Sequence, residues 1–162
     1  MILIGHGAPP KDAPGELVQR LKGLEARRRA AGGPPSTEEL ALDVRLRRWP
    51  RTEASDPYRA GIEAVARALV TRLDGARVLV AYNEFCAPTL QEAVDDAIAG
   101  GATIVTVVPS MLTRGGIHSE VEIPEAIAAV RATRPGVEIR YAWPFDGEAV
   151  AELIAAQVAR AG

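Results

Sequence analysis

Four short apolar segments, separated by helical patterns, constrain the fold of this chain more than any other feature. Each segment is rich in leucine or β-branched residues, which is typical of strands buried in a parallel sheet. Strands that alternate with helices are joined by right-handed crossovers, which cover both faces of the sheet. The sequence therefore predicts a doubly wound α/β fold with a parallel sheet of about four strands and helices on both faces. The expected strands span residues 1–4, 76–82, 102–108 and 136–143.

Local signals mark where the helices between these strands begin. Asp56 followed by Pro57 is typical of an N-cap and a first helical turn. Thr89 and Glu92 have the spacing of a capping box, in which each residue bonds the backbone of the other. Further helices are expected at about 124–131 and 147–160.

The stretch between the first two strands departs from this alternation. It contains two helical patterns, at 16–30 and 36–49, and the second opens with the capping-box pair Ser36 and Glu39. We expect one domain over 1–162, with a helical, arginine-rich insertion at about 8–56. Its clustered arginines have two interpretations: a solvated helical face, or a local cationic surface for an anionic ligand. The arginines are at positions 27, 28, 29, 45, 47, 48 and 51.

Composition excludes several classes of protein. The 162 residues carry a net charge of −2, so no basic excess indicates nucleic-acid binding. The single cysteine, Cys86, excludes an internal disulfide framework and a multi-cysteine metal site. No apolar run approaches the roughly 18 residues of a membrane span. A strand-like segment at Met1 leaves no room for a signal peptide, so we expect a cytoplasmic protein without a membrane partner.

The three side chains with the most chemical potential all follow predicted strands. His6 follows the first strand, Glu84 the second, and His118 lies in the loop after the third. Ligands of open parallel sheets bind outside the carboxyl ends of the strands, so we expect these residues to share one site. His6 and His118 are the only two histidines of the chain. The alternative is a pair of loop histidines that bond nearby backbone and share no ligand.

Two imidazoles and a carboxylate suit a first-row transition metal that keeps open coordination positions. Neutral histidine also accepts a proton near neutral pH. Gly7, Gly115 and Gly116 flank the histidines and would let the backbone approach a large ligand closely. The residues therefore predict metal delivery coupled to proton removal.

Other sites find less support. No GxSxG, GxxxxGK[ST] or GxGxxG motif is present, which disfavours serine hydrolases and the usual nucleotide sites. We interpret Cys86 as a small buried residue rather than a metal ligand or nucleophile. Ser119 and Glu122 have capping-box spacing, so Glu122 is interpreted as a residue that fixes a helix start.

Three segments carry a family resemblance. They are residues 3–7 (LIGHG), 81–93 (AYNEFCAPTLQEA) and 108–124, in which Gly116-Ile117-His118 leads to Ile123-Pro124. In order and separation they resemble the class II tetrapyrrole chelatases of the CbiX/SirB type, the sirohydrochlorin cobalto- and ferrochelatases. The resemblance covers the first strand and residues 76–130.

This resemblance implies a four-stranded module whose carboxyl edge admits a macrocycle. It implies that His6 and His118 bind the incoming Co²⁺, Fe²⁺ or Ni²⁺ and help to remove pyrrole protons, with Glu84 as proton relay or third metal contact. The metal is a substrate, and no organic cofactor is implied. Short relatives pair as homodimers, so a homodimer is expected.

The tetrapyrrole would be polycarboxylated, like sirohydrochlorin. We expect Arg114, on the His118 loop, to contact its carboxylates, with Gly115, Gly116 and Gly7 beside the ring. Two alternatives remain open. One is a non-catalytic carrier of metal or tetrapyrrole with the same fold, and the other is a hydrolase or phosphoryl-transfer enzyme that uses His6.

Overall fold

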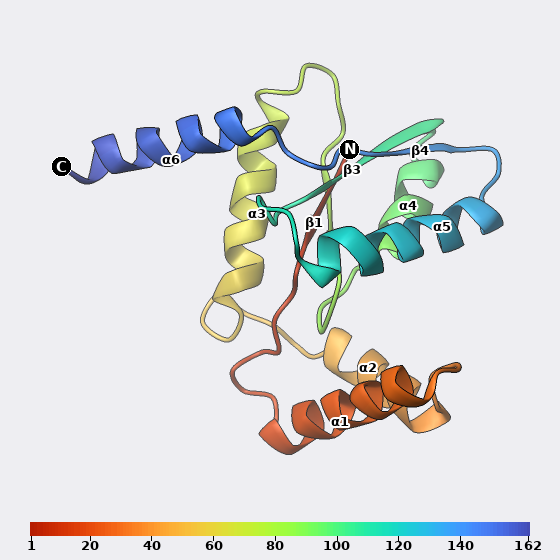
Figure 1. Cartoon of the computed structure of the whole chain (residues 1–162). Helices are drawn as coiled ribbons and strands as arrows, with labels where there is room; N and C mark the ends of the chain where they lie inside the picture. The colour runs from red at the N-terminus through yellow and green to blue at the C-terminus, as the bar shows by residue number, and fades with distance from the viewer.

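The computed structural model describes all 162 residues and contains one four-stranded parallel sheet (Figure 1). The strand order is β2-β1-β3-β4, so β1 lies in the interior of the sheet and pairs with both β2 and β3. Within these pairs Ile4 lies opposite Ala81 on one side and Pro109 on the other. The predicted parallel α/β fold is confirmed. The strands are β1 (Ile2–Gly5), β2 (Leu79–Tyr82), β3 (Ile104–Pro109) and β4 (Glu138–Tyr141).

The helices begin largely where the sequence signals placed them. Asp56 accepts a hydrogen bond from the Arg59 amide, and Thr89 and Glu92 form the complete capping box. The Ser36 hydroxyl accepts from the Glu39 amide, but the Glu39 carboxylate binds Arg28 instead of returning to the cap. The helices are α1 (Gly15–Ala31), α2 (Thr37–Arg47), α3 (Pro57–Val70), α4 (Leu90–Ala99), α5 (Ile123–Thr133) and α6 (Gly147–Ala161), with a π-helical turn η1 (His118–Glu122) that leads directly into α5.

Helices cover the two faces of the sheet unequally. On one face α4 and α5 bury the main core, in which Ile4, Val107 and Ile127 are almost fully enclosed. On the other face α3 packs over β1 and β2 through Ile62 and Ala66. The same face of β3 and β4 presents the exposed Ile104 and a Glu138–Arg140 ion pair.

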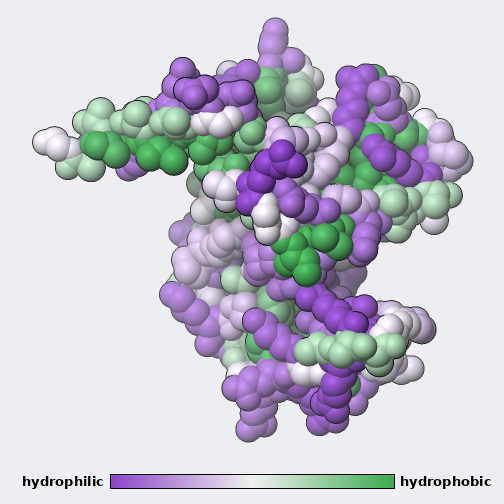
Figure 2. All heavy atoms as spheres, in the orientation of Figure 1, coloured by the Kyte–Doolittle hydropathy of each residue, from purple (hydrophilic) through white to green (hydrophobic).

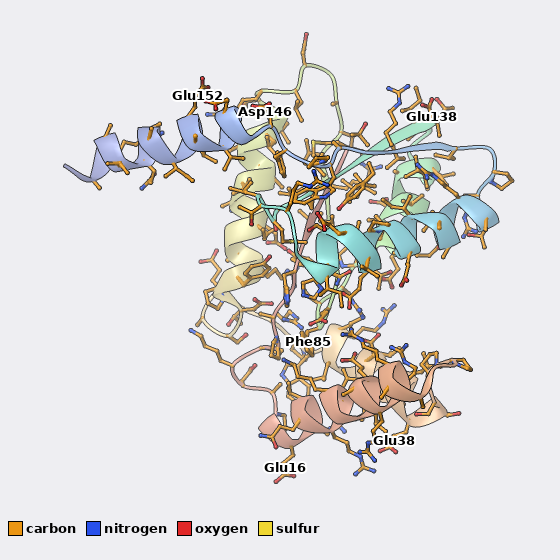
Figure 3. The ribbon with its side chains drawn as sticks, viewed as in Figure 1. Glu16, Glu38, Phe85, Glu138, Asp146 and Glu152 are labelled. Atoms are coloured by element: carbon orange, nitrogen blue, oxygen red, sulfur yellow. The ribbon has the colours of Figure 1, made fainter.

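The arginine-rich stretch, called the 8–56 segment from here on, lies at the carboxyl edge of the sheet. Its helices α1 and α2 form a pair beyond the ends of β1 and β2 (Figure 1). Phe85, which follows β2, lies between this pair and the sheet (Figure 3) and packs against Leu21, Leu42 and Leu46. The 8–56 segment therefore lies on the side of the sheet where ligands of such folds bind.

The last helix, α6, extends away from the rest of the chain (Figure 1). It buries none of its residues, and an apolar stripe that contains Leu153, Ile154 and Val158 is exposed along it (Figure 2). Among all the helices, none is both long and apolar enough to serve as a membrane span.

Candidate metal centre

The structure brings His6, Glu84 and His118 together at the carboxyl edge of the sheet. The two imidazole rings are perpendicular, with their centroids 4.2 Å apart. The His6 Nε2 atom lies 4.0 Å from a carboxylate oxygen of Glu84. Residues far apart in the sequence meet here because β1, β2 and β3 are parallel neighbours that end at the same edge.

Backbone contacts fix the orientation of His6. Its amide donates a hydrogen bond to the Tyr58 hydroxyl at 2.7 Å. Its ring Nδ1 lies 2.6 Å from the Gly7 carbonyl, which only accepts, so Nδ1 carries the proton. The Nε2 lone pair is therefore free to face Glu84. Gly7 has φ +90°, and a Cβ atom at this position would come within 1.9 Å of the Glu84 carbonyl oxygen, so only glycine fits.

A carboxylate orients His118 instead. Its Nδ1 lies 2.6 Å from Glu122, one helical turn further along, and 3.0 Å from the Asn83 amide nitrogen, and the shorter contact with an acceptor-only carboxylate puts the proton on Nδ1. The same carboxylate oxygen accepts from the Asn83 amide at 2.6 Å, and its other oxygen accepts from Arg29 at 2.6 Å. Because Nδ1 points at the carboxylate, the His118 Nε2 lone pair is also available.

Glu122 is held as an anion by these partners. Burial raises its pKa, but hydrogen bonds from His118 and Asn83 and the charges of His118 and Arg29 outweigh that effect and hold the pKa below its ordinary value. The interpretation of Glu122 as a helix cap is wrong: its side chain makes these contacts, and the Ser119 hydroxyl donates to the Gly116 carbonyl. Histidine and glutamate four residues apart share a helix face, which is the signal that could have predicted the pair.

Three residues each offer a metal ligand atom, and these atoms all lie within 4.8 Å of one another: Glu84, His118 and Glu122. All three side chains are half-buried. Both Glu122 oxygens already accept hydrogen bonds, whereas the Glu84 carboxylate has a 4.0 Å approach of the His6 Nε2 atom. This arrangement gives Glu84 the more available carboxylate and Glu122 the place of an outer partner of His118.

A cavity of about 420 Å³ adjoins this centre. Arg114 does not line it: its side chain is 76% exposed and approaches Glu120 at 3.5 Å. Gly7, Gly115 and Gly116 are also absent from its wall. The lining residues come from the 8–56 segment, the β2 exit, the end of the loop before η1, η1 itself and α5: Glu25, Arg28, Arg29, Arg47, Asn83, Glu84, Ile117, Val121, Glu122 and Glu125.

The arginines of the 8–56 segment divide into two groups. Arg48 is exposed and pairs with Glu92, in agreement with a solvated helical face. Arg47 and Arg51 are instead enclosed, and their guanidinium groups bind main-chain carbonyls of the loop after β2. Cys86 lies in the same loop, where burial raises the pKa of its thiol to about 11, so it is a small buried residue and not a thiolate at neutral pH.

Comparison with known proteins points in one direction. The model of the CbiX family matches residues 54–161. The chain is 35% identical over 66 residues to a sirohydrochlorin ferrochelatase of Priestia megaterium, which covers 41% of this chain and 24% of that protein. It is 36% identical over 72 residues to a sirohydrochlorin cobaltochelatase of Methanopyrus kandleri strain AV19, which covers 44% of this chain and 50% of the relative. These matches thus span half or less of the curated relatives.

Solved structures share the fold. A protein of Marinobacter aquaeolei VT8, described as a CbiX protein of cobalamin (vitamin B12) biosynthesis, aligns over 98% of this chain and 96% of its own, with a TM-score of 0.55 and 22% identity. SirB from Bacillus subtilis, solved with Fe³⁺, aligns over 93% of this chain and 42% of its own, with a TM-score of 0.50 and 22% identity. The family match covers about two thirds of the sequence, and the chain therefore belongs to the CbiX family.

Proposed function

We propose that the chain is a chelatase, a lyase that inserts Co²⁺, Fe²⁺ or Ni²⁺ into a polycarboxylated tetrapyrrole such as sirohydrochlorin. The observation that carries this proposal is the pair of imidazoles, 4.2 Å apart, with Glu84 beside them at the carboxyl edge of the sheet. The two curated relatives, named as sirohydrochlorin chelatases, support the same reaction.

The proposed metal contacts are His6, His118 and Glu84. Each histidine has its Nδ1 directed at an acceptor, which leaves both Nε2 lone pairs free for the incoming ion. Two neutral imidazoles and one carboxylate leave coordination positions open for ring nitrogens, so the ion can pass from the protein to the macrocycle.

Metal insertion also requires proton removal, because each ion that enters displaces two protons from the ring nitrogens. His118 is the first candidate acceptor, since the Glu122 carboxylate stabilises the imidazolium that forms. Glu84, with a half-buried carboxylate 4.0 Å from His6, serves as the second acceptor and passes protons to water. No hydride or electron moves in this reaction, so it needs no organic cofactor.

The tetrapyrrole contacts proposed are Arg114, Gly115, Gly116 and Gly7. The Arg114 guanidinium is exposed and has only a 3.5 Å approach to Glu120, so it can pair with a peripheral carboxylate of the substrate. Glycines beside both histidines leave room for a flat ring to approach the metal.

Purified protein mixed with sirohydrochlorin and Co²⁺ should change the visible spectrum of the tetrapyrrole at a rate that depends on both reactants. His6→Ala and His118→Ala should each lower that rate by at least a hundredfold, whereas the exposed control Arg20→Ala should not. Unchanged rates in both histidine variants would refute the assignment. If the protein instead binds one equivalent of metal or tetrapyrrole tightly and does not turn over, it is a carrier of the same fold.

We also propose that two copies pair in the cytoplasm through α6. The exposed apolar stripe of α6 supports a second copy as its partner. Val158→Glu should convert a dimer into a monomer in sedimentation experiments, and an unchanged mass would reject this interface.

A further inference from the structure

The loop between β2 and α4 carries two groups of the candidate centre but has little regular structure of its own. Asn83 and Glu84 lie in it, outside any strand or helix. Phe85 follows with φ +56°, a left-handed conformation that a large side chain rarely adopts. Such a backbone persists only where its surroundings determine it.

Arg47, at the end of α2, supplies part of that support. Its side chain is only 15% exposed, and its Nε atom pairs with Asp43 at 2.8 Å. The rest of the guanidinium donates to the carbonyls of Asn83 at 2.8 Å and Cys86 at 3.1 Å. The Arg47 carbonyl in turn accepts from the Ala87 amide at 3.2 Å. Arg47 thus holds the loop on both sides of Glu84.

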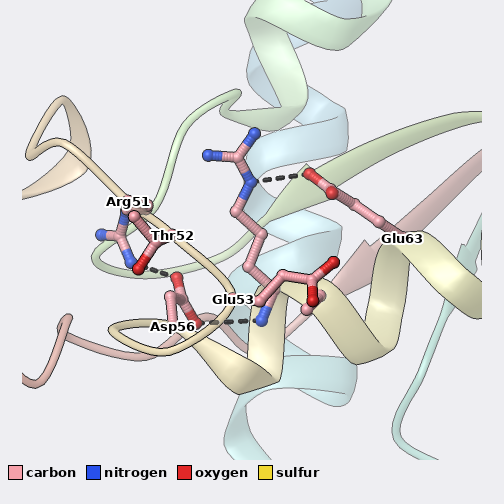
Figure 4. A pocket seen from close by; sticks show the side chains of 7 residues that line it. Arg51, Thr52, Glu53, Asp56 and Glu63 are labelled. Atoms are coloured by element: carbon pink, nitrogen blue, oxygen red, sulfur yellow. Dashed lines mark hydrogen bonds and ion pairs between the residues drawn. The ribbon is translucent and has the colours of Figure 1, made fainter.

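Arg51 provides a second support to the same loop. Its side chain is 2% exposed and donates to the Phe85 carbonyl and, at 3.0 Å, to the Ala8 carbonyl. Asp56 also accepts from this guanidinium (Figure 4). The cavity of about 250 Å³ next to it is lined by none of the candidate metal-binding residues.

A third arginine of the 8–56 segment acts on the other side of the centre. Arg29 of α1 binds Glu122 at 2.6 Å, and Glu122 orients His118. The 8–56 segment therefore contacts the surroundings of Glu84 through the enclosed Arg47 and Arg51, and the surroundings of His118 through the exposed Arg29.

We propose that the 8–56 segment is the scaffold of the metal centre, and that Arg47 is a positioning residue that acts through Glu84. This inference rests on the proposed function, in which Glu84 contacts the metal. The planar guanidinium binds a carboxylate and two carbonyls at once, in directions that a lysine ammonium cannot reproduce. Without these hydrogen bonds the loop becomes more mobile, and the Glu84 carboxylate is no longer held at a fixed distance from the histidines.

Co²⁺ binding by the protein alone tests this proposal, because it needs no turnover. Arg47→Lys should weaken Co²⁺ binding about tenfold or more, and it should shift the visible d–d absorption of the bound ion toward that seen in Glu84→Gln. The matched control is Arg48→Lys, at the next position, whose side chain is 68% exposed and should leave both quantities unchanged.

A double variant separates positioning from general damage. If Arg47 acts through Glu84, adding Arg47→Lys to Glu84→Gln should cause almost no further loss of Co²⁺ affinity. Losses that multiply, or an Arg47→Lys protein that binds Co²⁺ like the wild type, would overturn the proposal. Should Arg47→Lys fail to fold, Asp43→Asn replaces it, with the same expected spectrum and non-additivity.

The same experiments keep this inference apart from the proposed function. A wild-type chain that binds Co²⁺ but never metallates sirohydrochlorin would refute the enzyme, while the coupling of Arg47 to Glu84 would still be measured with the metal alone. In an active enzyme, Arg47→Lys should raise the KM for Co²⁺ and leave the KM for the tetrapyrrole near that of the wild type. A rise in the tetrapyrrole KM alone would overturn the positioning role.

Discussion

The two histidine loops meet at one point but are built in different ways. The His6 loop lies against the main chain that follows β2, and its imidazole bonds a neutral carbonyl and remains 41% exposed. His118 stands on a helical turn, is 21% exposed, and bonds a carboxylate. The same residue type thus has a neutral partner in one loop and an anionic partner in the other.

This difference suits the two imidazole rings to different chemical roles. A carbonyl partner fixes the tautomer and the direction of a ring but adds little to its basicity, which suits His6 to a metal contact. A carboxylate partner stabilises the imidazolium, which suits His118 to accepting a proton. Each of the following predictions breaks or sharpens this contrast.

The largest effect should come from Gly7→Ala compared with Gly115→Ala. Both glycines have φ +90°, but only at Gly7 would a Cβ atom collide with backbone, at the Glu84 carbonyl. We expect Gly7→Ala to lower the free energy of unfolding by about 3 kcal/mol or more and Gly115→Ala by about 1 kcal/mol. Urea denaturation measures both. Equal losses would show that the His6 loop is no more constrained than the His118 loop.

Glu122→Gln should affect catalysis more than folding. The amide keeps the shape of the side chain but removes the charge that stabilises an imidazolium at His118. We expect kcat for metal insertion to fall about 10- to 100-fold while Co²⁺ affinity changes less. Steady-state kinetics and calorimetric titration with Co²⁺ test this split. Equal losses in both would make Glu122 a metal ligand.

The fold was predictable from the sequence because its signals are local. Alternating apolar segments and helices, with Thr89 and Glu92 as a capping box, specify a parallel sheet almost by themselves. The relation of the 8–56 segment to the sheet was not predictable. It depends on the packing of Phe85 with Leu21 and on buried arginine–carbonyl bonds, which leave no periodic trace in the sequence.

The proximity of His6, Glu84 and His118 followed from one topological rule about strand ends. The residues that support this centre could not be predicted in the same way. Asn83 sits beside Glu84 without any motif of its own, and Glu122 matched a cap that the backbone does not form. Arg29 reaches Glu122 only because α1 lies across the sheet edge, a tertiary fact that spacing cannot express.

Tyr58→Phe tests the support of the His6 loop by α3. The Tyr58 hydroxyl accepts from the His6 amide at 2.7 Å, and it makes a longer contact of 3.4 Å with the Ser110 hydroxyl at the start of the His118 loop. Loss of the short bond to His6 should account for most of a cost of about 1 kcal/mol of stability, with a modest fall in Co²⁺ affinity. Thermal unfolding and Co²⁺ titration check both effects. A variant as stable as the wild type would show that the His6 loop keeps its conformation without the Tyr58 hydroxyl.

In acid, the metal-free protein should lose the part of its free energy of unfolding that Glu122 contributes. Because the folded pKa of Glu122 lies below its ordinary value, the ionised carboxylate adds stability above the unfolded pKa, and this contribution is lost as the pH falls through the lowered folded pKa. Wild type should therefore exceed Glu122→Gln by less than about 1 kcal/mol at pH 6, and this difference should shrink as the pH falls toward 3. Urea titrations at the two pH values decide. A gap that persists in acid would locate the stabilisation elsewhere.

Arg114→Ala should have the smallest effect, and it tests whether the His118 loop also reads the substrate. Its guanidinium is exposed, so the free energy of unfolding should change by no more than about 0.5 kcal/mol. If Arg114 pairs with a tetrapyrrole carboxylate, the KM for sirohydrochlorin should rise severalfold while the KM for Co²⁺ stays constant. Lys11→Ala, an exposed cation in the chain that follows His6, is the matched control and should change neither KM. Equal KM shifts in both variants would reduce Arg114 to one charge among many, and the contrast between the loops would then rest on their histidines alone.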